Sequence, residues 1–241
     1  MKTKPQYDLI GKALLDYQKG KTGGKLKVYS TIAEPDEIPV KYFFREPEDM
    51  PPIEQKALGL CYGRILDVGA AAGCHSLALQ KAGQTVIPID SSPGAVEVMR
   101  ARGLNQARPA DFFELENESF DTILMLMNGT GICSTLNGLE SFLQKAGELL
   151  APDGQILVDS SDILYMYEQD DGSVIIDLNS GYYGEVEYRF GYGRRKGPAF
   201  NWLFVDFDLL AEYAARHGLN CELVMEGEHY DYLARIGKNV T

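Results

Sequence analysis

Hydrophobic positions along the chain alternate between two spacings, one typical of buried strands and one typical of amphipathic helices. Mainly apolar runs predict strands over residues 65–68, 85–90, 120–127, 221–225 and 230–236, and a further short strand is expected over 106–112. Apolar positions three or four apart predict helices over 7–18, 53–61, 76–81, 95–102, 139–150 and 206–217. Strands that alternate with helices indicate an α/β fold built on a mostly parallel sheet.

A glycine-bearing turn joins the first of these strands to its helix. Ile65, Leu66 and Val68 suit a buried strand, and Gly69 and Gly73 relieve the steric limits on a tight turn. Backbone N–H groups at the start of the following helix favour an anionic group, and the missing side chains let a ligand approach the backbone. The turn is therefore the first candidate ligand site.

The spacing of residues in this turn distinguishes two families. The dinucleotide pattern G-x-G-x-x-G, begun at Gly69, fails at Ala71 and again at Cys74. The pattern acid-x-Gly-x-Gly-x-Gly is met at Asp67, Gly69 and Gly73, with Ala71 in the middle place. This resembles motif I of the class I S-adenosylmethionine (SAM)-dependent methyltransferases. The segment 149–159, Leu-Leu-Ala-Pro-Asp-Gly-Gln-Ile-Leu-Val-Asp, is similar to the family's helix, Pro-x-Gly turn and fifth strand.

A carboxylate follows the second strand of the unit. Asp90, with Ser91 beside it, stands at the carboxyl end of strand 85–90, where a carboxylate accepts both hydroxyls of a ribose. NAD-binding proteins use the same device, so Asp90 alone indicates a nucleoside cofactor of either kind. The alternative role is capping of the next helix, but Ser92 followed by Pro93 supplies that start.

The resemblance also implies roles at the ends of the next two strands. Asp111 would accept from the adenine amine and Phe112 would pack beside it, whereas the alternative for Asp111 is a solvated turn. Asn128 would lie beside the transferable methyl group, or serve as an ordinary Asn-Gly turn. The expected cofactor-binding residues are Asp67, Gly69, Ala71, Gly73, Asp90, Ser91, Asp111, Phe112 and Asn128.

Catalytic residues and metal ligands are not identified from the sequence. Asp159, Ser160, Ser161 and Asp162 crowd the end of the fifth strand, and any of them would serve as a general base or as a cap. Asn128-Gly-Thr-Gly is not the Asp/Asn-Pro-Pro-aromatic sequence of the DNA amino-methylating branch. Cys133 follows Ile132, not the proline that the cytosine-C5 branch requires.

Composition narrows the partners further. The chain has 23 Lys and Arg against 35 Asp and Glu, a net charge of −12, which repels phosphate backbones and disfavours nucleic acid as the acceptor. The four cysteines are scattered singly, as expected for free thiols in a reducing compartment. No apolar run reaches the length of a membrane span, and the N-terminus lacks a signal-like segment, so we expect a cytoplasmic protein.

Two regions lie outside the resemblance. Residues 1–52 form an N-terminal extension, expected after its first helix to be irregular. By resemblance, its aromatic residues and Arg45 would form a lid over the cofactor; alternatively, the aromatics cover the sheet edge and Arg45 is a surface ion-pair partner. Residues 163–205 are an inserted Tyr- and Gly-rich segment with strands expected at 174–178, 186–190 and 200–205. Its basic run 194–196 would grip an anionic acceptor or form a solvated turn.

The resemblance implies a Rossmann-like, doubly wound sheet of seven mostly parallel strands with a reversed C-terminal strand. We expect one domain over residues 53–241, with the N-terminal helical extension and the inserted β-hairpin region attached to it. The expected activity is methyl transfer from SAM to a small-molecule acceptor. A catalytically silent SAM-binding sensor and an NAD-dependent oxidoreductase are the alternatives.

Overall fold

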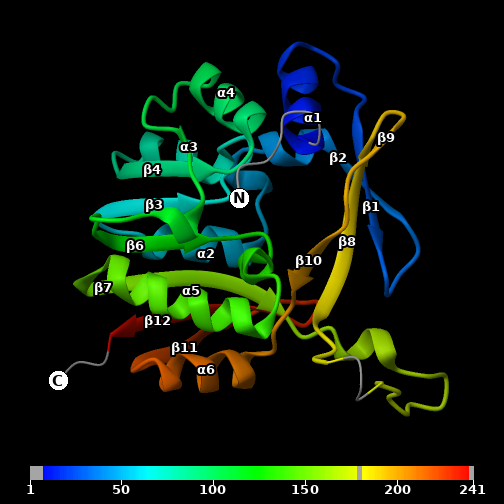
Figure 1. The fold of residues 1–241 in the computed structure, drawn as a ribbon. Helices are drawn as coiled ribbons and strands as arrows, with labels where there is room; N and C mark the ends of the chain where they lie inside the picture. Colours follow the sequence, from blue (N-terminus) through cyan, green and yellow to red (C-terminus); the bar gives the residue numbers. More distant parts are fainter. Residues whose placement is uncertain (1–7, 178–180, 239–241) are drawn as a thin grey trace.

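The computed structural model describes residues 8–177 and 181–238, and its larger sheet has seven strands in the order β11-β12-β7-β6-β3-β4-β5 (Figure 1). Strands β3 to β7 run parallel, and β12 runs antiparallel to both of its neighbours. The bounds are β3 (Arg64–Val68), β4 (Thr85–Asp90), β5 (Arg108–Pro109), β6 (Phe120–Met125), β7 (Leu150–Ser161), β11 (Leu219–Glu226) and β12 (Asp231–Lys238). The predicted seven-stranded, doubly wound sheet with a reversed last strand is confirmed.

Helices cover both faces of this sheet because successive residues of each strand point to opposite sides. Ile65 of β3 packs with α2 (Pro52–Leu60) and α3 (Cys74–Lys81), whereas Leu66 packs with α5 (Leu136–Leu149) and α6 (Phe207–Arg216). Helix α4 (Pro93–Ala101) lies at the β4–β5 end of the sheet (Figure 1). Because β3, β4, β6 and β7 run parallel, their carboxyl ends share one edge of the sheet. Ligands of such sheets bind at this edge.

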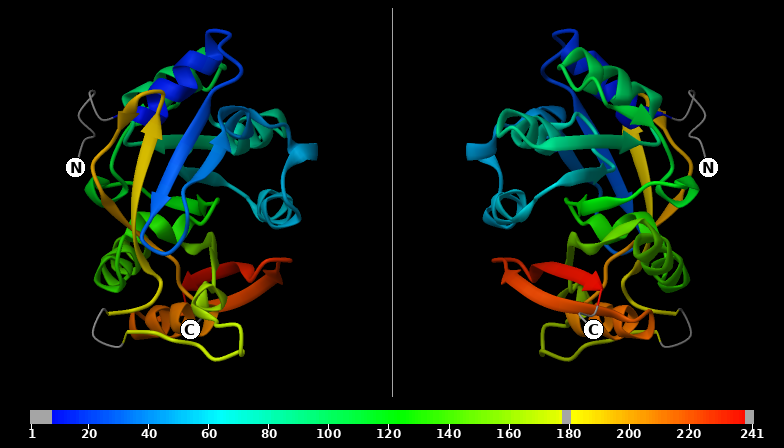
Figure 2. Two further views of the ribbon diagram at one scale, coloured as in Figure 1. Left: turned by 90° about the vertical axis from the view of Figure 1, so that its right-hand side faces the viewer. Right: turned by 90° about the vertical axis from the view of Figure 1, so that its left-hand side faces the viewer.

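A second, antiparallel sheet faces this edge, and it joins the two regions that lie outside the family resemblance. Its order is β10-β8-β1-β2, with β9 paired to β8 (Figures 1 and 2). Strands β1 (Lys25–Ser30) and β2 (Asp36–Pro39) come from the N-terminal region; β8 (Glu185–Tyr192), β9 (Arg195–Lys196) and β10 (Phe200–Leu203) come from the inserted one. Helix α1 (Leu9–Gln18) packs against α4.

The close approach of α1 to α4 depends on two glycines and one carboxylate. A Cβ on Gly94 would lie 2.7 Å from backbone atoms of Gly11. Asp8 caps α1 by accepting from the Gly11 N–H, and it also accepts from the Ser92 hydroxyl and the Gly94 N–H at the start of α4. One carboxylate thus satisfies donors at the N-termini of both helices.

The structure corrects several sequence-based expectations. The N-terminal region contains β1 and β2, where an irregular chain was expected. Over 174–177 the backbone forms no strand beyond a single bridge between Val174 and Glu168, and residue 178 lies outside the described residues, as does residue 7 of the predicted first helix. The strand expected over 106–112 shortens to the two residues of β5, and β6 ends at Met125, three residues before Asn128.

The cysteines and the helix lengths agree with the composition of the chain. All four cysteines are free thiols, as predicted. Over the described residues, no helix combines the length and apolarity needed to cross a bilayer.

Candidate active site

The turn between β3 and α3 relies on backbone conformations that favour glycine. Gly69 and Gly73 have φ angles of 72° and 77°, and Ala71 between them has a φ of 49°. A Cβ on Gly73 would lie 2.4 Å from Leu104 Cδ1, whereas a Cβ on Gly69 would meet nothing within 4 Å. The positive φ and the buried Leu104 side chain therefore both disfavour a side chain at Gly73, whereas Gly69 borders open space.

The N-terminal region packs directly on this turn. Ala72 is fully buried in a cluster with Ala13 and Leu14 of α1 and Leu26 of β1, and the Ala71 methyl group packs against the same cluster. A positive φ costs an alanine about 1–2 kcal/mol, and this packing offsets part of that cost. Residues of the N-terminal region, outside the Rossmann-like core, thus fix Ala71 in the middle of the turn.

Asp90 connects the end of β4 to the turn. Its carboxylate accepts from the Ala71 N–H at 2.9 Å and from the Ser92 N–H at 2.8 Å. Burial raises the pKa of Asp90 to about 6, although both backbone hydrogen bonds act in the opposite direction. Ser92 caps α4 through the Ala95 N–H, as the sequence predicts, and Ser91 is exposed beside it. Asp90 is therefore not the helix cap.

Asp67 lies beneath the turn. It is 2% exposed, and its carboxylate accepts a 2.6 Å hydrogen bond from the Ser76 hydroxyl of α3. Burial raises the pKa of Asp67. This contact ties β3 to α3, so that the carboxylate supports the turn from below.

Asp111 and Phe112 follow β5 at the same edge. The Asp111 carboxylate accepts from the Phe113 N–H at 3.1 Å and caps a short 3₁₀ turn. Phe112 is 3% exposed and packs its ring against Phe142 of α5, with centroids 5.3 Å apart. The Phe112 ring thus belongs to the core, with its backbone at the sheet edge.

Asn128 lies in a strained loop after β6. Met127 and Asn128 have positive φ angles of 69° and 60°, and the Asp159 carboxylate at the end of β7 accepts from the N–H groups of Met127 and Gly129 at 3.1 and 2.8 Å. Burial raises the pKa of Asp159 to about 6. Asn128 Oδ1 is buried and has no hydrogen-bond partner among the described residues. Consecutive strained residues of this kind cluster at functional sites.

Other polar residues at the end of β7 bind neighbouring backbone and hydroxyl groups. Ser160 accepts from the Thr130 hydroxyl and the Val205 N–H, and Asp162 accepts from the Leu164 N–H and the Tyr183 hydroxyl. Asp159, Ser160 and Asp162 thus accept hydrogen bonds from neighbouring backbone and side chains. The geometry assigns none of them as a general base.

A buried ionic cluster was missed by sequence reasoning. Arg45 pairs with Glu54 of α2, and His75 Nε2 of α3 lies 2.7 Å from the same carboxylate. Arg45 also donates to the Tyr42 carbonyl and lies 3.7 Å from Met127 Sδ, while its Nε has no partner among the described residues. Because Arg45 is only 7% exposed, the expectation of a surface ion pair is wrong.

Chemically, this edge combines features that suit a nucleoside with an amino-acid tail. There is open space at Gly69 and a carboxylate one strand away at Asp90. Asn128 Oδ1 and Arg45 Nε are buried polar atoms that find no partner within residues 8–177 and 181–238. Asp111 adds a further carboxylate beyond Asp90, because β5 follows β4 in the sheet. The residues at this edge therefore fit a nucleoside that carries an amino-acid tail.

Comparisons with known proteins agree with this geometry. A family model described as a methyltransferase domain matches residues 65–154. A SAM-dependent methyltransferase from Bacteroides fragilis, crystallised with S-adenosyl-L-homocysteine (SAH), is 44% identical; the alignment covers 100% of this chain and 98% of that one, with a TM-score of 0.93.

More distant proteins share parts of the architecture. The CcbJ methyltransferase from Streptomyces caelestis is 15% identical, with a TM-score of 0.63 over 81% of this chain and 99% of that one, and shows the fold alone. A demethylmenaquinone methyltransferase from Tropheryma whipplei is 28% identical over 109 residues. That match spans less than half of either protein, 43% of this chain and 44% of the relative. The full-length similarity to the B. fragilis protein, together with the fold and the glycine turn, shows that this chain belongs to the class I SAM-dependent methyltransferases.

Proposed function

We propose that this methyltransferase acts on a small molecule whose planar, apolar part binds between the carboxyl edge of the large sheet and an aromatic face of the second sheet. The aromatic face consists of Tyr188 and Phe190 of β8, Phe200 and Trp202 of β10, and Phe204. These rings are half-buried. Their position beside the loop after β6 is the observation that carries the proposal.

The rings contact one another in a continuous array. Tyr188 and Trp202 stack with centroids 6.2 Å apart and planes 18° apart, and Phe200 lies edge-on to both. Trp202 packs so closely on Gly131 that a Cβ there would lie 1.9 Å from the indole. The aromatic face is thereby fixed against the segment that begins at Asn128. Rings fixed in this way present apolar surface and π faces suited to a planar ligand.

The cofactor residues divide by the part of SAM that each would hold. The Asp90 carboxylate is suited to the two ribose hydroxyls, with Ser91 exposed beside it, and the open space at Gly69 admits the cofactor to the backbone. Asp111 and the backbone of Phe112 lie toward the adenine side. Asn128 and Arg45, whose buried Oδ1 and Nε find no partner among the described residues, are suited to the polar groups of the amino-acid end.

The remaining residues shape the turn. Asp67 supports it from below, Gly73 starts α3, and the Ala71 N–H orients Asp90. Bound SAM supplies an electrophilic methyl group on a good leaving group. The protein therefore needs mainly to align the acceptor and to keep water out, and well-aligned proximity contributes about 7–11 kcal/mol.

Labelled methyl transfer tests this function. With methyl-labelled SAM and fractionated metabolite extracts, we expect label in small molecules that carry a planar ring. Replacing Tyr188→Ala should lower turnover about tenfold or more and leave the affinity for SAH within about twofold, since an aromatic contact to a bound ring is worth roughly 1–3 kcal/mol.

The control is Tyr62→Ala, which removes a 43% exposed ring just before β3, at the amino edge of the large sheet and so opposite the proposed site. Label confined to protein or nucleic acid, or equal turnover of the two variants on a small-molecule acceptor, would contradict the proposed acceptor. Binding of SAM without transfer to any acceptor would favour the silent sensor.

A further inference from the structure

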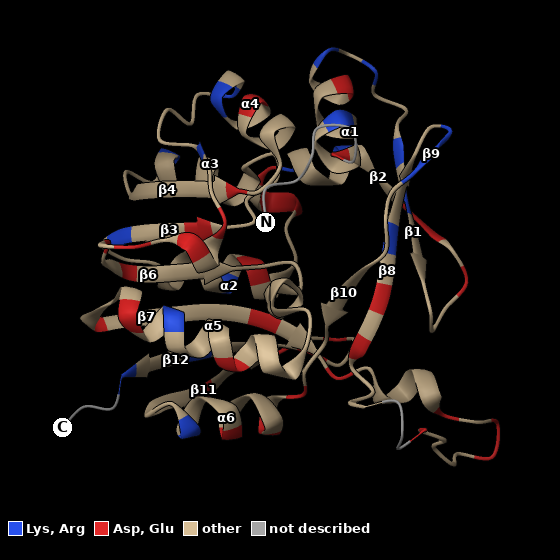
Figure 3. Ribbon diagram, in the orientation of Figure 1, with Lys and Arg blue, Asp and Glu red and all other residues tan. Residues whose placement is uncertain are grey.

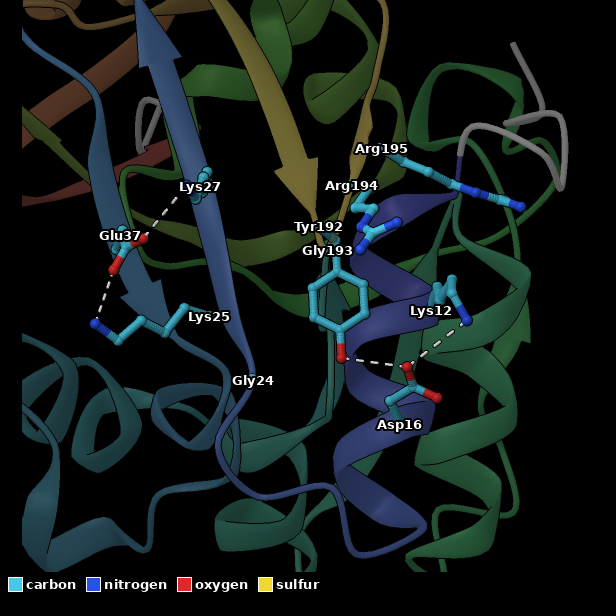
Figure 4. Close-up of a pocket in the computed structure, with 10 residues that line it drawn as sticks. All are labelled: Lys12, Asp16, Gly24, Lys25, Lys27, Glu37, Tyr192, Gly193, Arg194 and Arg195. Atoms are coloured by element: carbon cyan, nitrogen blue, oxygen red, sulfur yellow. Dashed lines mark hydrogen bonds and ion pairs between the residues drawn. The ribbon is translucent and has the colours of Figure 1, made fainter.

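A cavity of about 510 Å³ lies outside the methyltransferase site, between α1, the β1–β2 hairpin and the turn that joins β8 to β9 (Figure 4). None of its lining residues belongs to the glycine turn or to the aromatic face. We propose that this cavity is a second ligand site, which binds a small polyanion carrying phosphate or carboxylate groups.

The charge of the lining opposes that of the whole molecule. Five basic residues line the cavity against two acidic ones, in a chain whose net charge is −12. The basic residues are Lys12, Lys25, Lys27, Arg194 and Arg195. Figure 3 shows the blue segments of α1, β1 and β9 gathered in this part of the molecule. Such a local reversal of sign concentrates anions at the cavity.

The two acidic residues are already neutralised within the cavity wall. Glu37 pairs with Lys25 at 2.7 Å and with Lys27 at 3.7 Å. Asp16 pairs with Lys12 at 3.6 Å and accepts from the Tyr192 hydroxyl at 3.2 Å. Neither carboxylate therefore cancels the charge of the arginines.

Arg194 and Arg195 are the residues that best fit an anion. Neither forms an ion pair with any carboxylate of the described chain, and Figure 4 shows both side chains extending from the β8–β9 turn toward α1. Gly193 (φ 60°) forms the tight turn that presents them, and β9 pairs back onto β8 through Arg195 and Tyr192. A guanidinium group is planar and presents several N–H donors, which match the oxygens of phosphate or carboxylate groups.

The size and surroundings of the cavity select a small ligand. Its volume falls within the roughly 300–1,000 Å³ of ordinary small-molecule sites. A long phosphate backbone would extend over the acidic remainder of the surface and be repelled there. Helix α1 separates this site from the cofactor site: Lys12 and Asp16 face the cavity, while Ala13 and Leu14 pack with Ala72 of the glycine turn.

Titration with inorganic tripolyphosphate at low ionic strength tests the proposal. We expect saturable one-to-one binding to the full chain in calorimetry, unchanged when SAH is present at saturation. The double variant Arg194→Gln/Arg195→Gln should weaken this binding tenfold or more. Because both side chains are exposed, its melting temperature without tripolyphosphate should equal that of the unmodified protein.

A charge-matched control separates a site from general attraction. Arg189→Gln/Lys56→Gln removes the same two charges from exposed positions outside the cavity and should leave the affinity within about twofold. Absence of saturable binding, equal weakening by the two double variants, or displacement of tripolyphosphate by SAH would each overturn the proposal. The SAH titration of the same samples reports on the methyltransferase site independently.

Discussion

Replacing Asp90→Ala should weaken the binding of SAH by roughly 30- to 150-fold, the largest loss that we expect from any single change at the cofactor site. Loss of a charged acceptor for two hydroxyls costs about 2–3 kcal/mol. The same change also removes the acceptor of the Ala71 N–H, which lies 2.9 Å away and sets the shape of the glycine turn. Calorimetric titration of both proteins with SAH measures the difference.

The same carboxylate makes the affinity depend on pH. The pKa of Asp90 is raised to about 6, so the ionised form that accepts best is lost as the pH falls through that value. Between pH 7.5 and 5 we expect the affinity of the unmodified protein for SAH to fall about tenfold, and that of Asp90→Ala to change little. Asp153→Ala changes an exposed residue near the amino end of β7, at the opposite edge of the sheet; it is the control and should titrate with SAH like the unmodified protein. Full affinity of Asp90→Ala for SAH would contradict the assignment of Asp90 as the acceptor of the ribose hydroxyls.

Replacing Glu54→Ala should lower the free energy of unfolding by about 3–5 kcal/mol. The change leaves Arg45 buried without its carboxylate, and an uncompensated buried charge carries that cost. Because Arg45 comes from the N-terminal region and lies 3.7 Å from Met127 Sδ, the variant should also loosen the segment beside the loop after β6. Urea unfolding followed by circular dichroism measures the stability.

A neighbouring ion pair provides the matched control. Glu46 pairs with Lys81 at 2.8 Å, but both side chains are more than half exposed, so Glu46→Ala should cost only about 0–1 kcal/mol. Burial favours the neutral form of Glu54, but the hydrogen bonds and charges of His75 and Arg45 lower its pKa below 4.5. A lowered pKa means that the stabilisation is present above pH 4.5 and fades as the pH falls through the folded value. The gap between Glu54→Ala and the unmodified protein should therefore narrow in acid, and equal costs for the two variants at pH 7 would contradict this account.

Local patterns predict most of the large sheet, because most of its strands and helices have an apolar periodicity of their own. The glycine turn at Gly69 and the capping of α4 by Ser92 follow from neighbouring residues in the same way. The second sheet does not follow from local patterns, because its strands are far apart in the sequence: Leu26 of β1 pairs with Tyr192 of β8. Its N-terminal strands lie in a stretch whose many prolines and aromatics lack a regular pattern.

The buried cluster escaped prediction for a related reason. Arg45, Glu54 and His75 stand on three separate elements, and charged residues near helix starts are usually solvent-exposed. The apolar run at 174–177 shows the opposite error. Val174 and Ile175 have strand-like composition, but they are 44% and 65% exposed and have no partner strand among the described residues. A segment of strand-like composition forms a strand only where another strand can pair with it.

The central claim is that the turn at Gly69 holds the cofactor, and a pair of alanine variants tests it most directly. Gly69 and Gly83 both have positive φ angles, 72° and 81°, and at both a Cβ would meet nothing within 4 Å. Each change to alanine should therefore lower the free energy of unfolding by a similar amount, about 1–2 kcal/mol. In the proposed complex, only the methyl group of Gly69→Ala would meet the cofactor where it approaches the backbone. Calorimetric titration with SAH should show at least tenfold weaker binding for Gly69→Ala and unchanged affinity for Gly83→Ala; equal affinities in the two variants would contradict the account.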